Sequence, residues 1–473
     1  MRYISTRGKD NGVTAKEAIL RGLARDGGLY VPEAIPVIDR PLSELLQLPY
    51  TKLAHAILRP FLDFTDEELT ECVEKAYAAN RFTDPKIAPV KSAAGVHFLE
   101  LFHGPTLAFK DMALSILPHL MTVSASQQED KEMIILTATS GDTGKAALEA
   151  FCDVPGTSII VFYPEKGVSN LQKRQMITQE GSNTYVYGIR GNFDDAQTGV
   201  KNIFSNMVLE KGKEFSSANS INIGRLLPQI CYYFYAYAQL DIRLGSEVNF
   251  VVPTGNFGNI LAGYYAKKMG LPIRKLICAS NDNKVLYDFF RTGSYDKNRE
   301  FYCTISPSMD ILVSSNLERL LFHATGAEIV RGMMENLSGQ GRFELKANLP
   351  DFYGAHATED EVRKAIYEVG QKGYVMDTHT AVAYHAGRRY IAETGDNTPQ
   401  VVIATASPFK FAEDVLKALG VEVGTDDMAN VQALSEKSGL PVPEALARLA
   451  HLPVRHNIIC DVSEMQKVVM GGI

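Results

Sequence analysis

The chain has 473 residues, of which 45% are apolar and 22% charged, a composition typical of a globular protein with two or three domains. Its 48 basic and 55 acidic residues give a net charge of −7, which argues against general nucleic-acid binding because that function needs a basic surplus. The six cysteines form no CxxC motif, so they predict neither a zinc site nor a disulfide framework.

The sequence predicts neither secretion nor membrane insertion. The first residues, MRYISTRGKD, carry charges but are not followed by the apolar stretch of a secretory signal. The most apolar uncharged run, residues 226–240, is too short to span a bilayer and contains Gln229 and Gln239. We therefore expect a cytoplasmic protein of the size of an enzyme, with scattered thiols in a reducing compartment.

The predicted elements divide the chain into two parts. Residues 1–90 show mostly helical patterns, with turns at 26–28 and 32–36, and are expected to form a segment that packs on the rest. After it, apolar runs alternate with helical patterns, which indicates an α/β fold with mostly parallel sheets. The expected strands are residues 133–137, 158–163, 184–189, 248–252, 274–279 and 401–404. The expected helices are residues 144–151, 259–269, 359–372 and 380–393, and a last strand is expected at 456–460.

Lys110 lies among apolar neighbours in the stretch HGPTLAFKDM, residues 103–112. Desolvation lowers the pKa of a lysine from roughly 10.4 towards neutrality, so that the amine can form a Schiff base or act as a base. A solvated lysine beside Asp111 is the simpler interpretation of this stretch taken alone.

The loop TSGDTG, residues 139–144, follows an expected strand and opens an expected helix. Its hydroxyls and helix-start N–H groups suit a carboxylate, and an N-capping turn explains it equally well. A Walker A nucleotide loop is rejected because Thr139 stands where its first glycine is required. In addition, Ala146 stands where a serine or threonine would hold magnesium.

The loop PTGNFGN, residues 253–259, also connects an expected strand to an expected helix. Its glycines allow several backbone N–H groups to point into one concavity at a helix N-terminus, which suits a phosphate. It lacks both the GxGxxG pattern and an acidic ribose clamp, so a dinucleotide is disfavoured, and a plain strand-to-helix turn is the alternative.

A third loop follows the expected strand 401–404. Its Thr405 and Ser407 offer hydroxyls to a ring nitrogen, although a strand-end turn is the better interpretation of this loop alone. A phosphate cradle combined with a Schiff-base lysine is what pyridoxal phosphate requires.

Taken in order, the stretches HGPTLAFKD, TSGDTG and PTGNFGN resemble threonine synthase, a family of pyridoxal-phosphate enzymes with the fold type of tryptophan synthase β (fold type II). The resemblance covers nearly the whole chain to about residue 411. Further matching stretches are MRYISTRG (1–8), GLARDGGLYVP (22–32), GNFDDAQ (191–197), NSINIGRLLPQICYYFYA (219–236), SPSMDILVSSNLERLLF (306–322) and DTHTAVA (377–383).

The resemblance implies two open, twisted, mostly parallel-sheet domains with pyridoxal 5'-phosphate in the cleft between them. The larger cofactor-binding domain would comprise residues 91–120 and 241–473, and the smaller one residues 121–240. The mainly helical segment of residues 1–90 would precede them. The family resemblance leaves monomer and homodimer undecided and implies no metal.

The implied reaction converts O-phospho-L-homoserine and water to L-threonine and phosphate, the last step of threonine biosynthesis. Lys110 would hold the cofactor as an internal aldimine and then act as acid and base. The cofactor would further contact Gly255, Asn256, Phe257, Gly258 and Asn259 through its phosphate, Thr405 through its pyridine nitrogen and Asp142 through its ring. The substrate carboxylate would contact Thr139, Ser140, Asp142 and Thr143. The substrate phosphate would contact Asn219, Ser220 and Arg225, and Lys410 is a further candidate for this contact.

Several of these residues have simpler interpretations. Arg225 precedes a long apolar helix and fits a surface arginine, although its charge opposes the helix dipole there, which favours a functional role. Asp142 fits a helix cap. The aromatic run 232–237 is better explained by core packing, and His103 by a turn, whereas His379 fits either the core or the surroundings of the site.

Two positions depart from the family pattern, and two other functions compete. Ser407 and Thr378 stand where the family commonly has His and Pro, and the first departure affects the surroundings of the pyridine nitrogen. A phospho-lyase on the same scaffold would form 2-oxobutyrate and ammonia instead of threonine. A cofactor-binding scaffold without catalysis is the non-enzyme alternative, and the intact Lys110 argues against it.

Overall fold

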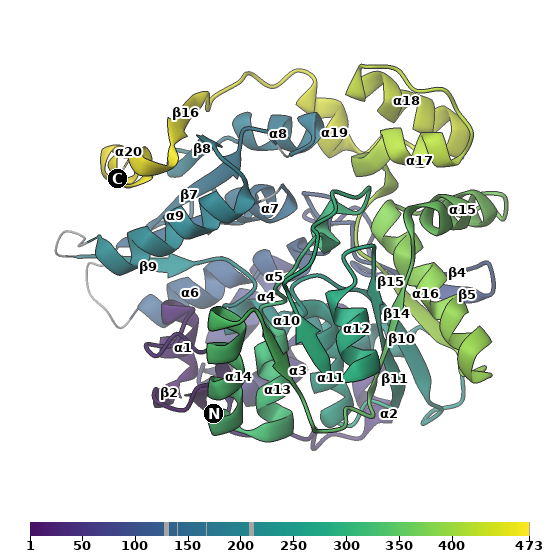
Figure 1. Cartoon of the computed structure of the whole chain (residues 1–473), viewed down its shortest axis with the longest axis horizontal. Coiled ribbons are helices and arrows are strands. Elements are labelled where there is room, and N and C mark those ends of the chain that lie inside the picture. Colours follow the sequence, from purple (N-terminus) through teal and green to yellow (C-terminus); the bar gives the residue numbers. More distant parts are fainter. Residues whose placement is uncertain (127–131, 140, 167, 208–211, 473) are drawn as a thin grey trace.

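The computed structural model describes residues 1–126, 132–139, 141–166, 168–207 and 212–472 (Figure 1). Two open sheets form the α/β body, and all six strands predicted from apolar runs belong to them. The α/β fold class is therefore confirmed. None of the described helices is long and apolar enough to cross a membrane.

The N-terminal segment combines helices with a small sheet that the sequence patterns did not predict. Its strands are too short to show a clear alternation, and they pair antiparallel in the order β2-β1-β3. They are β1 (Arg2–Ser5), β2 (Asn11–Thr14) and β3 (Tyr30–Pro32). The helices are α1 (Ala15–Arg21), α2 (Leu42–Leu45), α3 (Tyr50–Leu58), η1 (Arg59–Phe61) and α4 (Asp66–Ala76), and both α1 and α4 begin with capping boxes.

The larger sheet has six strands in the order β14-β11-β10-β15-β5-β4, all parallel except the edge strand β4. In chain order they are β4 (Val90–Ala93), β5 (Val96–Glu100), β10 (Val248–Pro253), β11 (Ile273–Ser280), β14 (Phe352–His356) and β15 (Gln400–Ala404). One face packs against α10 (Ile223–Ala238) and α11 (Gly258–Lys268), and the other against α16 (Thr378–Thr394). Apolar residues on both faces of the strands produce this two-sided burial.

The smaller sheet has five parallel strands in the order β16-β8-β7-β6-β9. They are β6 (Glu132–Ala138), β7 (Thr157–Pro164), β8 (Thr184–Arg190), β9 (Lys213–Ser217) and β16 (Ile458–Asp461). The associated helices are α7 (Asp142–Phe151), α8 (Asn170–Ile177), α9 (Phe193–Asn206) and α20 (Met465–Gly472).

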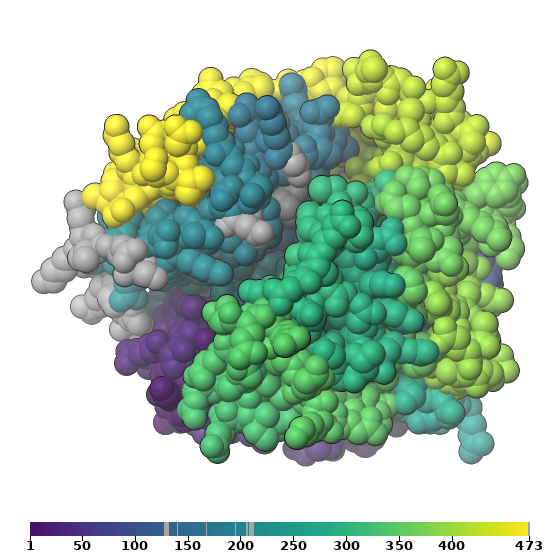
Figure 2. All heavy atoms as spheres, in the orientation of Figure 1, coloured from purple at the N-terminus to yellow at the C-terminus, as the bar shows by residue number. Residues whose placement is uncertain are grey.

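Two segments cross the domain boundaries expected from the sequence. The end of the chain, expected within the larger domain, returns to the smaller sheet, where β16 pairs with β8 and α20 packs on α9. Figure 2 shows these yellow C-terminal residues lying against the teal surface of the smaller-sheet region. Conversely, α10, expected in the smaller domain, packs on α11 and α3 because apolar side chains cover nearly its whole circumference.

The remaining elements connect the two sheets or cover them. They are α5 (Asp111–Leu114), α6 (Leu117–Ala125), α12 (Val285–Thr292), β12 (Ser294–Asp296), η2 (Pro307–Met309), α13 (Leu317–Thr325), α14 (Ala327–Gly339), β13 (Arg342–Glu344), α15 (Glu359–Gly370), η3 (Pro408–Phe411), α17 (Ala412–Ala418), α18 (Asp427–Ser438), α19 (Glu444–Leu449) and η4 (Val462–Glu464).

The fully buried Arg319 joins the N-terminal segment to the α/β body. Its Nε donates to the Tyr30 carbonyl at 2.9 Å and its Nη2 to the Ile221 carbonyl at 2.6 Å, while its Nη1 donates to Asn316 Oδ1. The neighbouring Glu318 accepts from Thr6 and Arg7. One arginine therefore fixes the N-terminal segment, the loop before α10 and the loop before α13.

We expect Arg319→Met to lower the free energy of unfolding by about 3 kcal/mol, because three buried acceptors would lose their donor at about 1 kcal/mol each. Urea denaturation measures this change. Arg388→Met, at an exposed position of α16, is the matched control and should stay within about 0.5 kcal/mol of the parent. Equal losses in the two variants would contradict the linking role of Arg319.

Candidate active site

The segment that carries Lys110 is paired with the third predicted loop. Phe109 N–H donates to the Thr405 carbonyl at 2.8 Å, and Ser407 N–H donates to the Leu107 carbonyl at 3.0 Å. The loop follows β15 and the lysine segment follows β5, its parallel neighbour, so both lie at the carboxyl edge of the larger sheet. The sequence predicted both segments but not this pairing, in which Ser407 serves the turn through its backbone.

The side chain of Lys110 is largely buried, with an exposed fraction of 11%. Its Nζ lies 3.6 Å from Asp142 Oδ2 and 4.7 Å from the centre of the Phe109 ring. Burial lowers the pKa of Lys110; Asp142 opposes this shift, whereas Lys410 and Arg225 add to it. The amine is thus predisposed to lose its proton, as a Schiff-base lysine must.

Asp111 does not pair with Lys110 and takes part in a turn instead. Its carboxylate accepts from Thr106 Oγ1 at 2.6 Å and from Thr106 N–H at 2.8 Å, and burial raises its pKa to about 6. A Cβ on Gly104 would lie 2.6 Å from Asp111, so the Gly-Pro turn closes tightly over this carboxylate. The interpretation of Lys110 as a solvated lysine beside Asp111 is therefore wrong.

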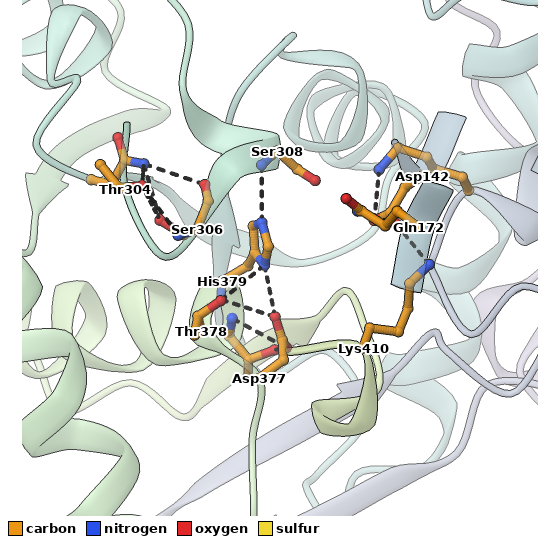
Figure 3. A network of polar contacts seen from close by, with 12 residues as sticks. Asp142, Gln172, Thr304, Ser306, Ser308, Asp377, Thr378, His379 and Lys410 are labelled. Atoms are coloured by element: carbon orange, nitrogen blue, oxygen red, sulfur yellow. Dashed lines mark hydrogen bonds and ion pairs between the residues drawn. The ribbon is translucent and has the colours of Figure 1, made fainter. Parts of the chain in front are cut away.

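Asp142 begins α7 at the carboxyl edge of the smaller sheet and faces Lys110 across the gap between the sheets. Its Oδ1 accepts from Lys410 Nζ at 2.6 Å and from Gln172 Nε2 at 3.0 Å (Figure 3). Burial alone would raise the pKa of this carboxyl, but Lys410 and Lys110 hold the pKa well below its usual range. Asp142 is thus a fixed anion rather than a helix cap.

The other predicted residues of this loop have different surroundings. Thr139 Oγ1 accepts from Gly141 N–H at 3.0 Å and from Gly144 N–H at 2.9 Å, so this hydroxyl shapes the turn. A Cβ on Gly144 would lie 2.4 Å from Thr139 Cγ2, which explains the glycine. Thr143 is half-buried, and Ser140 lies outside the described residues.

The loop between β10 and α11 has the constrained backbone of an anion cradle. A Cβ on Gly255 would lie 2.6 Å from the Ser308 carbonyl, and Phe257 adopts φ 64°, which is rare for a residue other than glycine. The Asn256 carbonyl accepts from Asn316 N–H at 3.1 Å and from its Nδ2 at 2.9 Å. These bonds hold the start of α11, where Gly258 and Asn259 follow.

The side chain of Asn259 gives the cradle a hydrogen-bond donor that has no acceptor among the described residues. Its Oδ1 accepts from the hydroxyls of Tyr232 at 2.7 Å and Tyr233 at 2.8 Å, whereas its buried Nδ2 has no partner among the described residues. A buried donor without an acceptor is costly, so it suits a bound anion. The two tyrosines, interpreted from the sequence as core packing, therefore also orient Asn259.

Arg225 lies in the first turn of α10, as expected, but it is not a surface residue. It is 3% exposed, its Nη1 donates to the Ala218 carbonyl at 2.8 Å, and its Nε has no partner among the described residues. Burial lowers its pKa to about 10. The half-buried Asn219 and Ser220 precede it in the same loop. An unpaired, buried guanidinium nitrogen suits an anionic ligand.

The two histidines considered from the sequence have structural surroundings. His103 Nε2 lies 2.9 Å from Glu100 Oε2 at the turn before Lys110, in agreement with a turn role. His379 is buried; its Nδ1 lies 2.9 Å from Asp377 Oδ1, and its Nε2 accepts from Ser308 N–H at 3.1 Å (Figure 3). It therefore supports the turn that touches Gly255, while the adjacent Thr378 is fully buried in α16.

The tight approach at Gly255 can be tested by substitution. We expect Gly255→Ala to weaken binding of pyridoxal phosphate at least tenfold, because the added methyl meets a backbone carbonyl that cannot rotate away. Fluorescence titration of the cofactor-free chain measures this affinity. In Gly332→Ala, on α14, the methyl enters open space, and this control should bind the cofactor normally. Normal binding by both variants would show that the cofactor does not need this approach.

The residues present fit pyridoxal phosphate. The site combines a buried lysine with a lowered pKa, a cradle with the Nδ2 of Asn259, and the Nε of Arg225, two nitrogens that are unpaired among the described residues. Lys110 and Lys410 both act on the carboxylate of Asp142. No group of three or more His, Cys, Asp or Glu side chains within the described ranges is placed to hold a metal ion.

The comparisons with known proteins agree with this fit. Residues 86–406 match the family model "Pyridoxal-phosphate dependent enzyme". Fold and site together define an enzyme of that class, with fold type II. Residues 2–77 match "Threonine synthase N terminus" and residues 380–469 match "Threonine synthase, C-terminal". The chain belongs to the threonine synthase family.

Relatives and solved structures are similar over nearly the full length. The threonine synthase of Pseudomonas aeruginosa is 40% identical over 88% of this chain and 90% of its own, and that of Saccharomyces cerevisiae is 37% identical over 88% and 89%. The pyridoxal-phosphate-bound threonine synthase structure from Brucella melitensis has a TM-score of 0.89 at 37% identity, and it covers 100% of this chain and 99% of its own.

Proposed function

We propose that the chain converts O-phospho-L-homoserine and water to L-threonine and phosphate. The observation that carries this proposal is the buried Arg225, whose Nε has no partner among the described residues and whose charge acts on Lys110. A substrate with a carboxylate at one end and a phosphate at the other needs two anion sites on either side of a base. Arg225 and the start of α7 would supply these two sites, since the amine of Lys110 lies 3.6 Å from Asp142 and is affected by the charge of Arg225.

A role is proposed for each group of residues in the site. When bound, pyridoxal phosphate supplies an electron sink, which acidifies the carbons next to the amino group of the substrate. Gly255, Asn256, Phe257, Gly258 and Asn259 would hold the cofactor phosphate at the start of α11. Asp142 would face the cofactor ring, and Thr405 its pyridine nitrogen.

Lys110 would transfer the protons. Because the phosphate leaves from Cγ, protons must be removed first from Cα and then from Cβ. The flexible Lys110 side chain can reach neighbouring carbons, and its lowered pKa favours the unprotonated amine that acts as a base.

The substrate anions would be held on either side of this lysine. Thr139, Ser140, Asp142 and Thr143 are proposed at the carboxylate; there the backbone N–H groups of the α7 start supply donors, and Thr139 shapes the loop. Asn219, Ser220 and Arg225 are proposed at the phosphate, with a guanidinium that pairs with phosphate oxygens.

We further infer a cytoplasmic enzyme of the aspartate-family pathway that acts on small molecules. The six cysteines are all unpaired in the structure, as is common in a reducing compartment.

Substrate analogues test the need for both anions. The cofactor-loaded protein should release phosphate from O-phospho-L-homoserine but not from 3-aminopropyl phosphate, which lacks the carboxylate, when phosphate is measured colorimetrically. Similar release from both compounds would contradict the carboxylate site. No release from O-phospho-L-homoserine would contradict the substrate and the role of Arg225.

A further inference from the structure

A buried ion pair between Lys410 and Asp142 joins the two sheets close to Lys110. Lys410 lies in η3, after β15 of the larger sheet, and Asp142 begins α7, after β6 of the smaller sheet. The Lys410 side chain has an exposed fraction of 0%; its Nζ lies 2.6 Å from Asp142 Oδ1 and donates to the Thr106 carbonyl at 3.0 Å. Its position is therefore fixed from both sides of the site.

The two oxygens of Asp142 have different partners. Oδ1 accepts from Lys410 and Gln172 (Figure 3). Oδ2 lies 3.6 Å from Lys110 Nζ, a longer distance. An ammonium and a carboxylate in a direct charge-assisted bond lie at about 2.7–2.9 Å. Asp142 is thus bonded to Lys410 and only near Lys110.

This arrangement differs from the one expected for Lys410 from the sequence, where it was a candidate for the substrate phosphate. Its ammonium is already committed to a carboxylate and a carbonyl, whereas Arg225 retains a nitrogen without a partner among the described residues. Of the two buried cations, Arg225 is therefore the better phosphate ligand, and Lys410 needs another explanation.

We propose that Lys410 is a positioning residue that binds Asp142 Oδ1 and balances its charge, so that Lys110 remains a free amine. This inference rests on the proposed function, in which Lys110 transfers protons. Without Lys410, the carboxylate of Asp142 would turn to the nearest remaining ammonium, that of Lys110, and hold it in the protonated state. An ammonium that is kept protonated can neither attack a carbonyl nor accept a proton.

The charged groups that face Lys110 come from three elements: Asp142 from α7, Lys410 from η3 and Arg225 from α10. An opposite charge within about 4–6 Å shifts a pKa by roughly 1–3 units. Lys410→Met should accordingly raise the pKa of Lys110 by at least about 1 unit. Asp142→Asn removes the only anion among these three groups and should lower the pKa of Lys110. In the double variant Asp142→Asn/Lys410→Met, the pKa of Lys110 should lie between the values of the two single variants.

The pKa of Lys110 can be measured in the cofactor-free full-length chain. Isotope-labelled formaldehyde with cyanoborohydride methylates only the free amine, and mass spectrometry of the peptide that contains Lys110 gives the labelling rate at each pH. Lys417→Met is the matched control, because Lys417 lies on the next helix, α17, and pairs with Glu413 at the surface. Its labelling midpoint should equal that of the parent.

The proposal is supported if Lys410→Met raises the midpoint and the double variant returns it towards the parent value. It is overturned if Lys410→Met moves the midpoint no more than Lys417→Met does while it raises the KM for O-phospho-L-homoserine, as loss of a phosphate ligand would. If Lys410→Met does not fold, Lys410→Gln decides, since it keeps a hydrogen-bond donor for Asp142 but removes the charge: a raised midpoint would support the proposal, and an unchanged midpoint would overturn it. Labelling needs no turnover, so a failure of the proposed substrate would leave this test intact.

Discussion

Replacement of Lys110 by alanine is expected to abolish covalent attachment of pyridoxal phosphate and to lower turnover by at least about 10³-fold, since one side chain supplies both the attachment and the proton transfers. The largely buried amine has no substitute at its position: Lys410 is bound to Asp142, and the guanidinium of Arg225 does not act as a base. Borohydride reduction followed by mass spectrometry measures the attachment, and phosphate release from O-phospho-L-homoserine measures turnover.

Lys145→Ala is the matched control for this variant. Lys145 is buried to a similar degree, with 14% exposed, but its Nζ is bound to Glu149 at 2.9 Å. We expect the control to retain the attached cofactor and most of its turnover. If Lys110→Ala also retained them, another lysine would carry the chemistry and the assignment of the site would be wrong.

The second large effect is expected at Arg225. Arg225→Met should lower kcat/KM for O-phospho-L-homoserine about 100-fold, because charge-assisted hydrogen bonds to a phosphate contribute about 1.5–3 kcal/mol. Cofactor affinity should change little, since the cofactor phosphate is assigned to the cradle at Gly255. Steady-state kinetics together with cofactor titration measure both quantities.

Two further variants show whether this loss is specific. Arg225→Lys keeps the charge but loses the planar fork, so its kcat/KM should lie between those of the parent and Arg225→Met. Arg190→Met removes an exposed arginine at the end of β8 that pairs with the exposed Asp461, and should leave kcat/KM unchanged. An unchanged KM in Arg225→Met would exclude Arg225 from the phosphate site.

The sequence predicted the strands and loops with strong local patterns. Apolar runs such as 158–163 and 248–252 suit strands that are buried on both faces, and the observed β7 and β10 extend them by one residue at one or both ends. The strands that were missed, among them β1, β5 and β12, have three to five residues, so they show no clear period. The return of β16 to the smaller sheet depends on long-range packing that no local pattern encodes.

The candidate site was predictable as a set of loops but not as a network. Glycine-rich strand-to-helix turns mark the loops at 139–144 and 253–259, because tight backbone approach leaves few residue choices. No local sequence pattern shows which residue a buried polar group pairs with. Lys410 and Asp142 are far apart in the sequence, and the hydroxyls of Tyr232 and Tyr233 belong to a run that core packing already explains.

The product balance tests the central claim most directly. The cofactor-loaded protein is incubated with O-phospho-L-homoserine, and threonine, 2-oxobutyrate and phosphate are measured in the same sample. The proposed function predicts one threonine for each phosphate. One 2-oxobutyrate for each phosphate would contradict it and would make the chain a phospho-lyase that uses the same site.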